Sequence, residues 1–396
     1  MTTRRHLCAG LLSAGLLAAV SGPALGRSEL PYIDSVVNEA ARAVIRQHDI
    51  AGMVIAVTHQ GRQRFYTYGV ESLETRRAVN RDTLFELGSI SKTFTVTLAA
   101  YAQAQGQLSL TDSPAKFLPE LAGTDFAKLT LLNLATHTTG GFPLQVPDAV
   151  QDDAQLMQYL KAWKPEPAPG TYRSYANPSI GMLGVVTAAS MKQPFAQAME
   201  KDLFPKLGLS STFIDVPPAK ASRYAQGYNK QGAPVRVNPG VLAAEAYGVK
   251  SSARDMLRFV EASMDMDVMD KDIRRAIADT HVGYYEVGGM TQDMVWEQFP
   301  YPVTLDTLLT ANAGTLNSQS HPAKALQPPL APQADTWINK TGSTNGFGAY
   351  VAFVPARKLG IVILANRNYP NEARVRLAAE ILSAVEKRPF PAGPSR

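Results

Sequence analysis

The chain has 396 residues, of which 45% are hydrophobic and 18% charged, and it carries a formal net charge of +5. These values are typical of a soluble globular protein with enough residues for a large core and more than one lobe. The mild positive charge is not concentrated in a basic run or an aromatic-interleaved patch, so we expect no nucleic-acid partner.

The first 26 residues have the pattern of an export signal. Arg4 and Arg5 precede the apolar segment 7–20, which is too short to cross a bilayer as a helix of the mature protein, and small residues at 24–26 suit cleavage. The general secretory route is favoured, and the paired arginines leave twin-arginine export open. We expect a periplasmic protein without a membrane anchor, and without disulfides because the single cysteine lies in the signal.

Strands and helices are predicted at both ends of the chain, and helices in its middle. In chain order, the predicted elements are helix 31–48, strands 52–58 and 63–70, helices within 182–191 and 195–207, strands 336–341, 348–354 and 359–365, and helix 371–387. The Pro-rich segment 321–333 is expected to be an exposed loop.

This order favours an α/β fold in which one antiparallel sheet is built from both chain ends and is flanked by helices. The α/β lobe comprises 27–105 and 221–396, and a mostly helical lobe, 106–220, is inserted into it. The two lobes form a single domain after the signal peptide, 1–26. A pocket between two lobes is the usual place for a ligand.

Ser89-Ile-Ser-Lys92 is the first motif that could carry chemistry. On a helix, this spacing puts the serine and the lysine on one face, with their Cβ atoms about 5–6 Å apart. A serine hydroxyl needs a base to become a nucleophile. The segment that follows is almost uncharged, so Lys92 would lose solvation, and its pKa would fall from about 10.4. The alternative is an ordinary lysine that extends its ammonium to solvent.

The same spacing occurs at Ser113-Pro-Ala-Lys116. Proline directly after the serine indicates a helix cap with Pro at the first helical position. We therefore interpret Ser113 as a cap and Ser89 as the nucleophile.

Two further motifs follow Ser89 in the chain. Tyr175-Ala-Asn177 lies in a polar loop, and Lys340-Thr-Gly342 lies on a predicted strand that leads to a turn. Lys-Thr-Gly occurs once, whereas Tyr-x-Asn also occurs at Tyr369-Pro-Asn371 and is weak alone. The order and separation of the three motifs carry the argument.

Together the motifs resemble the signature of the penicillin-recognising serine hydrolases, Ser-x-x-Lys, Ser-Asp-Asn and Lys-Thr-Gly. Tyr175-Ala-Asn177 in the second place is similar to class C (AmpC-type) β-lactamases rather than to class A. The similarity also covers the segments 85–94, 143–147, 245–250, 340–355 and 364–371. It spans nearly the whole mature chain and implies the β-lactamase/transpeptidase-like fold.

The resemblance implies the catalytic roles. Ser89 would attack the lactam carbonyl and form an acyl-enzyme. Lys92 and Tyr175 would share the proton transfer, and the sequence leaves the acylation base open. Lys340 and Lys92 would lower the cost of a Tyr175 phenolate. Asn177 would hold Lys92 and the side-chain amide of the substrate.

The resemblance also implies the groups that bind the substrate. The backbone N–H groups of Ser89 and Ser343 would form the oxyanion hole. The residues expected to bind the substrate are Lys340, Thr341, Asn371 and Arg374 around its carboxylate, Gln145 and Tyr247 around its side chain, and Gly342. Without the family, Asn371 and Arg374 would be interpreted as a capped helical turn with a solvated arginine, and Gln145 and Tyr247 as packing residues.

No metal or cofactor is expected. None of the six histidines forms a His-x-x-x-His pair, and the chain lacks a phosphate-binding loop and a dinucleotide fingerprint. His137 follows the apolar segment 131–135, and we interpret it as a structural histidine with satisfied hydrogen bonds.

The expected function is hydrolysis of β-lactams, with cephalosporins as the better substrates, by a monomer. Two alternatives use the same nucleophile. One is a D-amino-acid peptidase or esterase on the same scaffold, and the other is a penicillin sensor that is acylated without turnover. Gln145, Tyr247, Asn371 and Arg374 favour the lactamase. A sensor would normally carry a membrane anchor or a signalling domain.

Overall fold

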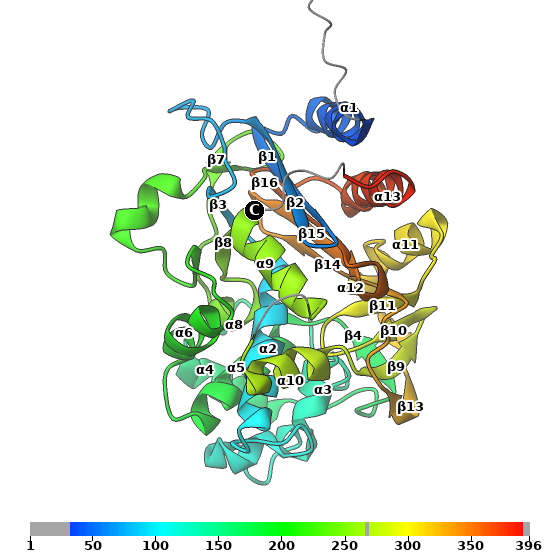
Figure 1. Ribbon diagram of the computed structural model, residues 1–396. Helices are drawn as coiled ribbons and strands as arrows, with labels where there is room; N and C mark the ends of the chain where they lie inside the picture. Colours follow the sequence, from blue (N-terminus) through cyan, green and yellow to red (C-terminus); the bar gives the residue numbers. More distant parts are fainter. Residues whose placement is uncertain (1–31, 266–268, 391–396) are drawn as a thin grey trace, which may run out of the picture.

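A nine-stranded antiparallel sheet forms the centre of the computed structural model, which describes residues 32–265 and 269–390 (Figure 1). The predicted signal peptide lies outside the described residues. The strands, from one edge to the other, are β13 (Lys324–Leu330), β9 (Gly283–Val287), β10 (Met290–Gln292), β11 (Glu297–Pro300), β14 (Thr336–Ser343), β15 (Gly348–Val354), β16 (Leu359–Ala365), β1 (Gly52–His59) and β2 (Arg62–Gly69).

Both chain ends supply the centre of this sheet, as predicted. Strand β1 pairs with β16 in a register that places Ile55 opposite Ile363. The sequences of both strands are almost continuously apolar, because both faces of each strand are buried. The expected α/β fold is therefore confirmed.

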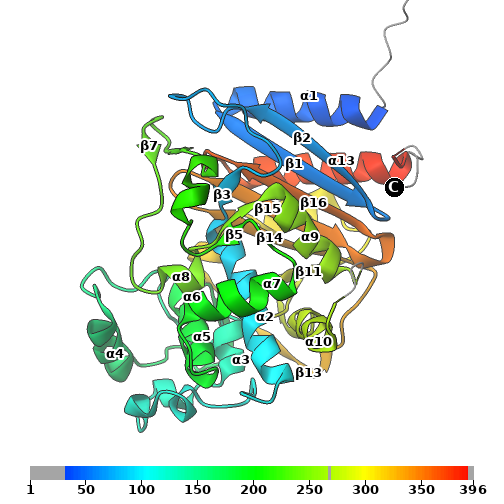
Figure 2. The ribbon, with the colours of Figure 1, turned by 60° about the vertical axis from the view of Figure 1, so that its left-hand side comes forward.

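Alternate side chains of the central strands enter two separate cores. Ile361 and Ile363 face α1 (Tyr32–Gln47) and α13 (Asn371–Lys387), whereas Val362 packs on the opposite side of the sheet. Figures 1 and 2 show α1 and α13 together on one face and α9 (Ala253–Ser263) on the other. Each fully buried aliphatic side chain contributes about 1.5–3 kcal/mol, so this double-sided packing holds the central strands firmly.

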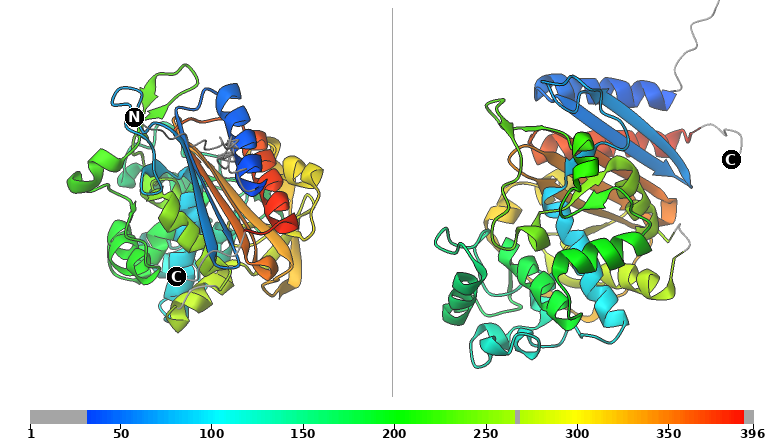
Figure 3. Two further views of the ribbon diagram at one scale, coloured as in Figure 1. Left: turned by 45° about the horizontal axis from the view of Figure 1, so that its top comes forward. Right: turned by 90° about the vertical axis from the view of Figure 1, so that its left-hand side faces the viewer.

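Helix α2 (Ser91–Ala104) runs through the interior between the sheet and the other helices (Figure 3). It packs against α5 (Asn177–Ser190) and α10 (Lys271–Thr280). The remaining helices are α3 (Leu131–Ala135), α4 (Asp153–Ala162), α6 (Phe195–Gln197), α7 (Phe204–Lys206), α8 (Ala243–Ala246), α11 (Leu305–Ala311) and α12 (Thr315–Ser318). Because α2 is buried almost throughout, its first turn is held rigidly at the base of the site.

Small sheets position the loops that carry the motifs. They comprise β3 (Leu84–Glu86) with β8 (Lys250–Ser252) and β5 (Thr212–Phe213), β4 (Tyr172–Ser174) with β12 (Ser320–Pro322), and β6 (Gly227–Tyr228) with β7 (Pro234–Val235). Strand β3 leads directly to Ser89, and β4 leads directly to Tyr175.

Two sequence-based expectations were wrong in detail. Most of the Pro-rich segment 321–333 belongs to strands, the last two residues of β12 and the edge strand β13, and only its end is a loop. An edge strand leaves one row of N–H groups unpaired and so accommodates prolines, and the pairing register shifts between Ala325 and Leu330. The predicted helix 195–207 is interrupted by a π-helical segment, Ala198–Leu203, close to Pro205, which has no N–H to continue an α-helix.

Candidate active site

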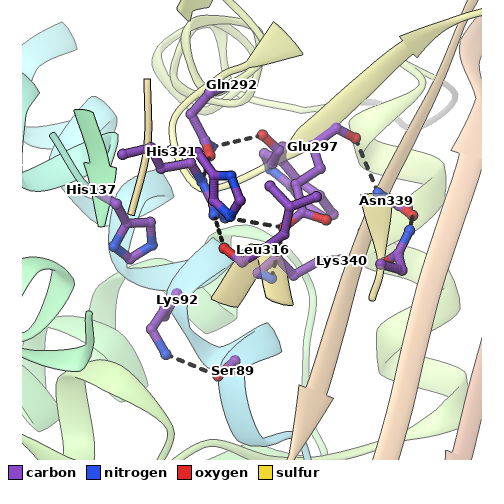
Figure 4. Close-up of polar contacts among 12 residues, drawn as sticks. Ser89, Lys92, His137, Gln292, Glu297, Leu316, His321, Asn339 and Lys340 are labelled. Atoms are coloured by element: carbon purple, nitrogen blue, oxygen red, sulfur yellow. Dashed lines mark hydrogen bonds and ion pairs between the residues drawn. The ribbon is translucent and has the colours of Figure 1, made fainter. Parts of the chain in front are cut away.

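Three elements converge on the site shown in Figure 4. Ser89 lies in a 3₁₀ turn, Gly88–Ile90 (η1), directly before α2. Tyr175 follows β4, and Lys340 lies in the middle of β14. The side chains of Lys92 and Lys340 are completely buried, whereas Ser89 is partly exposed and accessible to a ligand.

Ser89 and Lys92 are in direct contact. Lys92 Nζ donates a hydrogen bond of 3.0 Å to Ser89 Oγ and one of 2.9 Å to the carbonyl of Ala246. Burial lowers the pKa of Lys92, the phenol of Tyr175 opposes this shift, and the charge of Lys340 adds to it. A buried amine with a lowered pKa, next to a serine hydroxyl, is placed to exchange a proton with that hydroxyl.

Two glycines allow the nucleophile turn to pack against the end of β14. Gly88 has φ +53°, and a Cβ atom there would lie 2.4 Å from the backbone nitrogen of Ser343. A Cβ atom on Gly342 would lie 2.0 Å from the carbonyl oxygen of Leu87. Only glycine tolerates such an approach, so the backbones around Ser89 and Ser343 lie side by side.

Tyr175 is buried among cations. The ammonium nitrogens of Lys92 and Lys340 each lie 5.2 Å from the centroid of its ring, and the guanidinium carbon of Arg173 lies 5.4 Å away. Burial alone would raise the pKa of Tyr175. The charges of Lys340 and Lys92, with hydrogen bonds to Ser89 and Lys92, outweigh burial and lower this pKa to about 8. A tyrosine with this pKa can act as a base in mildly alkaline solution.

The sequence did not indicate a buried charge network behind Lys340. Glu297 Oε1 lies 3.5 Å from Lys340 Nζ and 3.4 Å from a guanidinium nitrogen of Arg173. Arg173 Nε also donates a hydrogen bond of 2.5 Å to Gln292. Glu297 is the one carboxylate in this network. It orients Lys340 while leaving the Tyr175 region with an excess of positive charge.

His137 supports the loop that carries Tyr175. Its Nδ1 accepts a hydrogen bond of 3.3 Å from the backbone N–H of Ala176, and its ring centroid lies 4.4 Å from that of Tyr175. Burial, followed by the charges of Arg173, Lys92 and Lys340, lowers the pKa of His137 well below its usual value, so the ring is neutral. The structural interpretation fits, but only one ring nitrogen is satisfied, because Nε2 is buried without a hydrogen-bond partner.

Asn177 begins α5 beside Tyr175. Its backbone N–H donates a hydrogen bond to the carbonyl of Leu144, the neighbour of the exposed Gln145, and its Oδ1 is buried without a partner. Within the described part of the chain, no hydrogen bond joins the side chains of Asn177 and Lys92. The structure therefore does not contain the expected contact between these two residues, and Asn177 keeps a free acceptor.

The other expected binding residues lie around these groups. Thr341 is buried beside Lys340, Ser343 is exposed, and Asn371 is half-buried at the start of α13. Tyr247 is half-buried directly after Ala246, whose carbonyl binds Lys92.

Arg374 requires a correction. It is completely buried, and it donates hydrogen bonds to the carbonyls of Gly342 and Ala349, to Ser343 Oγ and to Asn368. Its guanidinium is occupied by these acceptors, so it is not the solvated arginine of the alternative interpretation. The guanidinium instead anchors the end of β14 that contains Ser343.

Ser113 has the capping role predicted for it. Its Oγ accepts a hydrogen bond from the N–H of Ala115 and donates one to the carbonyl of Ala127. Lys116 extends to solvent and pairs with Asp112 at 2.8 Å. The two Ser-x-x-Lys motifs therefore differ in every contact that matters for chemistry.

Residues 32–265 and 269–390 contain no group of three or more His, Cys, Asp or Glu side chains that could hold a metal ion. The same residues include no helix that is long and apolar enough to cross a membrane.

Comparisons with known proteins identify the family of the chain. The β-lactamase family model matches residues 37–386. A β-lactamase of Lysobacter lactamgenus is 52% identical over 367 residues, which cover 91% of this chain and 95% of that protein. A solved structure described as β-lactamase/D-alanine carboxypeptidase from Pseudomonas syringae is 56% identical, with a TM-score of 0.89, and covers 91% of this chain and 100% of its own.

A class C β-lactamase solved in complex with cefoxitin is 45% identical, with a TM-score of 0.87, and the match covers 89% of this chain and 98% of that one. The family match, the identity and the shared fold, together with a serine, two lysines and a tyrosine gathered in one site, show that the chain belongs to the β-lactamase family and has the class C architecture.

Proposed function

We propose that the protein hydrolyses β-lactams, cephalosporins best, through an acyl-enzyme on Ser89. The observation that carries this proposal is the 3.0 Å contact between Ser89 Oγ and Lys92 Nζ, next to a tyrosine whose pKa is lowered to about 8. No other serine described above has a buried lysine and a tyrosine base beside it.

In the proposed acylation, Ser89 Oγ attacks the lactam carbonyl and gives its proton to the Lys92–Tyr175 pair. The C–N bond of the ring then breaks, and the departing nitrogen takes a proton from the same pair. In deacylation, water loses a proton to Tyr175 and attacks the ester, and Ser89 leaves with a proton. Both half-reactions return the Lys92–Tyr175 pair to its starting protonation state. The proposed cycle therefore needs neither a metal ion nor a carboxylate base.

The developing oxyanion would be bound by the backbone N–H groups of Ser89 and Ser343. Gly88 and Gly342 support this role because they allow η1 and β14 to approach closely. Loss of one oxyanion donor typically costs about 3–4 kcal/mol of transition-state stabilisation. Arg374 would act on this hole as a positioning residue through Ser343.

The substrate carboxylate would be bound by Lys340, Thr341 and Asn371, and Gly342 would act by letting β14 lie against the turn that carries Ser89. A charge-assisted contact with Lys340 suits an anion. The unpartnered Oδ1 of Asn177 supports a hydrogen bond to the amide N–H of the substrate side chain. Gln145 and Tyr247 would contact the same side chain.

A D-amino-acid carboxypeptidase is the second candidate, and the Pseudomonas syringae structure, described with both activities, favours keeping it. Both activities would use Ser89. A chromogenic cephalosporin and a D-Ala-D-Ala peptide, tested with the same preparation, would separate them. Fast cephalosporin turnover with slow peptide cleavage supports the proposal, and the reverse order would contradict it. Stable acylation without turnover would indicate a penicillin sensor.

We also propose that the protein is exported to the periplasm and acts as a monomer. The signal pattern in residues 1–26 supports export, and the lack of a long heptad pattern in the sequence supports the monomer. N-terminal sequencing of the periplasmic fraction, with light scattering of the purified protein, tests both statements.

A further inference from the structure

A polar pocket of about 520 Å³ adjoins the active site at Ser343 and Asn371. Besides Ser343, it is lined by residues 47–49, where α1 ends and the next turn begins, by residues 367–371, which reach the start of α13, and by Lys230. We call it the His48 pocket. Ser89, Lys92 and Tyr175 do not line it, so it is an extension of the site beyond the oxyanion strand and not the place of the chemistry.

The charges around the His48 pocket favour an anion. Lys230 and Arg367 line it, and Asp49 is the only acidic residue among its described lining. Arg374 lies behind the lining residues Ser343 and Asn368 and donates hydrogen bonds to both. In the described part of the chain, no carboxylate pairs with Arg374. A buried cation without a counter-ion produces a positive potential in the space next to it.

Unpartnered polar atoms line the same pocket. His48 Nε2 and the Tyr369 hydroxyl are buried without hydrogen-bond partners, and their ring centroids lie 5.6 Å apart. Burial, followed by the charge of Arg374, lowers the pKa of His48, and the charge of Asp49 opposes this shift. The ring is therefore neutral, and its Nε2 can donate a hydrogen bond. Buried polar groups are rarely left unpaired, and two that can donate suit the oxygens of an anionic ligand.

We propose that the His48 pocket binds a second anionic group of the substrate, a carboxylate or sulfonate on the substituent next to the ring carboxylate. Asn371 lines this pocket and is also proposed to contact the ring carboxylate. A substituent next to that carboxylate would therefore lie at the entrance of the pocket. The inference rests on the proposed function and adds a substrate class to it, β-lactams with two negative charges. Lys230 and Arg367 would set the preference for this class.

The test compares two cephalosporins that differ only in this substituent, a carboxylate in one and the carboxamide in the other. In the double variant Lys230→Gln/Arg367→Gln, the ratio of KM for the carboxylate to KM for the carboxamide should rise about tenfold. Lys230→Gln/Arg367→Lys keeps one charge and should give an intermediate ratio. Increasing salt should raise the ratio of the wild-type protein, because the two cations are partly exposed to solvent.

The matched control is Lys324→Gln/Arg376→Gln, which removes the same net charge from exposed positions outside the pocket. An unchanged ratio in the pocket variant, or an equal rise in the control, would overturn the inference. At constant ionic strength, phosphate should inhibit turnover of the carboxylate cephalosporin more strongly than turnover of the carboxamide. Equal inhibition of both substrates would also overturn the inference. If the wild-type protein acylates Ser89 with neither compound, the proposed function itself fails, and with it this inference.

Discussion

The chain contains the same four-residue spacing twice, and only one copy is built for chemistry. In the first copy, Lys92 is completely buried, and its Nζ contacts Ser89 Oγ at 3.0 Å. In the second, Ser113 caps a 3₁₀ turn, and the side chain of Lys116 is 57% exposed and paired with Asp112. Spacing puts a serine and a lysine on one turn in both cases, whereas burial and partners decide whether the lysine can act as a base.

The partner of each lysine explains the difference. Asp112 neutralises Lys116 at the surface, where such a pair contributes about 0–1 kcal/mol. Lys92 has no carboxylate partner among the described residues. Instead, the positive charges of Lys340 and Lys92 act on Tyr175 and lower its pKa. Burying a lysine without a counter-ion costs free energy. In the first copy, the same uncompensated charge is what lowers the pKa of Tyr175.

The largest contrast is expected from removing each serine. Ser89→Ala should reduce cephalosporin turnover about a millionfold, because no nucleophile remains. Ser113→Ala should keep its activity and lose about 1 kcal/mol of unfolding free energy, the usual value of a helix cap. Steady-state kinetics and urea unfolding measure the two effects. A folded but inactive Ser113→Ala protein would reverse the assignment of the two motifs.

Replacing each lysine by methionine should give the next largest contrast. Lys92→Met should slow acylation about a thousandfold, within the range for loss of a general base. The fold should be retained, since an apolar side chain of similar volume often replaces a buried charge without loss of stability. Lys116→Met should change acylation less than twofold. Rapid-quench mass spectrometry gives both rates, and full acylation by Lys92→Met would exclude the proposed role.

Tyr175→Phe should lower kcat/KM about a hundredfold and change its pH dependence. The wild-type profile should rise with pH, be half-maximal near pH 8 as Tyr175 loses its proton, and level off at higher pH, and the variant should lack this rise. The pKa of Tyr175 is lower in the folded protein than in the unfolded chain. The unfolding free energy of the wild type relative to Tyr175→Phe should therefore increase from about pH 8 to 10. A constant difference over this range would contradict the lowered pKa.

Gly88→Ala should show that the first motif also depends on its backbone. The new Cβ atom would lie 2.4 Å from Ser343, and the resulting shift should lower turnover about thirtyfold. Gly123→Ala is the matched control near the second motif, because Gly123 has φ +80° and no atom within 4 Å of a Cβ. It should cost about 1 kcal/mol of stability and leave turnover within twofold. Equal loss of turnover in both variants would exclude the close approach as the cause.

Elements with strong local patterns could be predicted from the sequence. The strands 348–354 and 359–365 and the helix 371–387 have the predicted bounds, since apolar runs between clear turns specify them. Strands β9, β10 and β11 were not predicted. They are short, partly polar, and formed by pairing with one another and with β14.

The site shows the same division. Ser89, Lys92, Tyr175 and Lys340 could be named because their motifs are local. Glu297 and Arg173 could not, since their charge network exists only after β11 has paired with β14 and β4 has brought Arg173 beside it. The burial of Arg374 was missed for a related reason. Its partners on β14 and β15 lie 25 or more positions away in the chain.

The position of β1 beside β16 has a consequence for the order in which the protein can fold. The N–H of Gly52 and the side chain of Asn366 form a hydrogen bond between residues 314 positions apart. The centre of the sheet therefore cannot close until nearly the whole chain has been synthesised, and such distant contacts slow folding. A chain that stops before β16 would leave β1 and β15 with unpaired apolar edges, which are the kind of edge that aggregates.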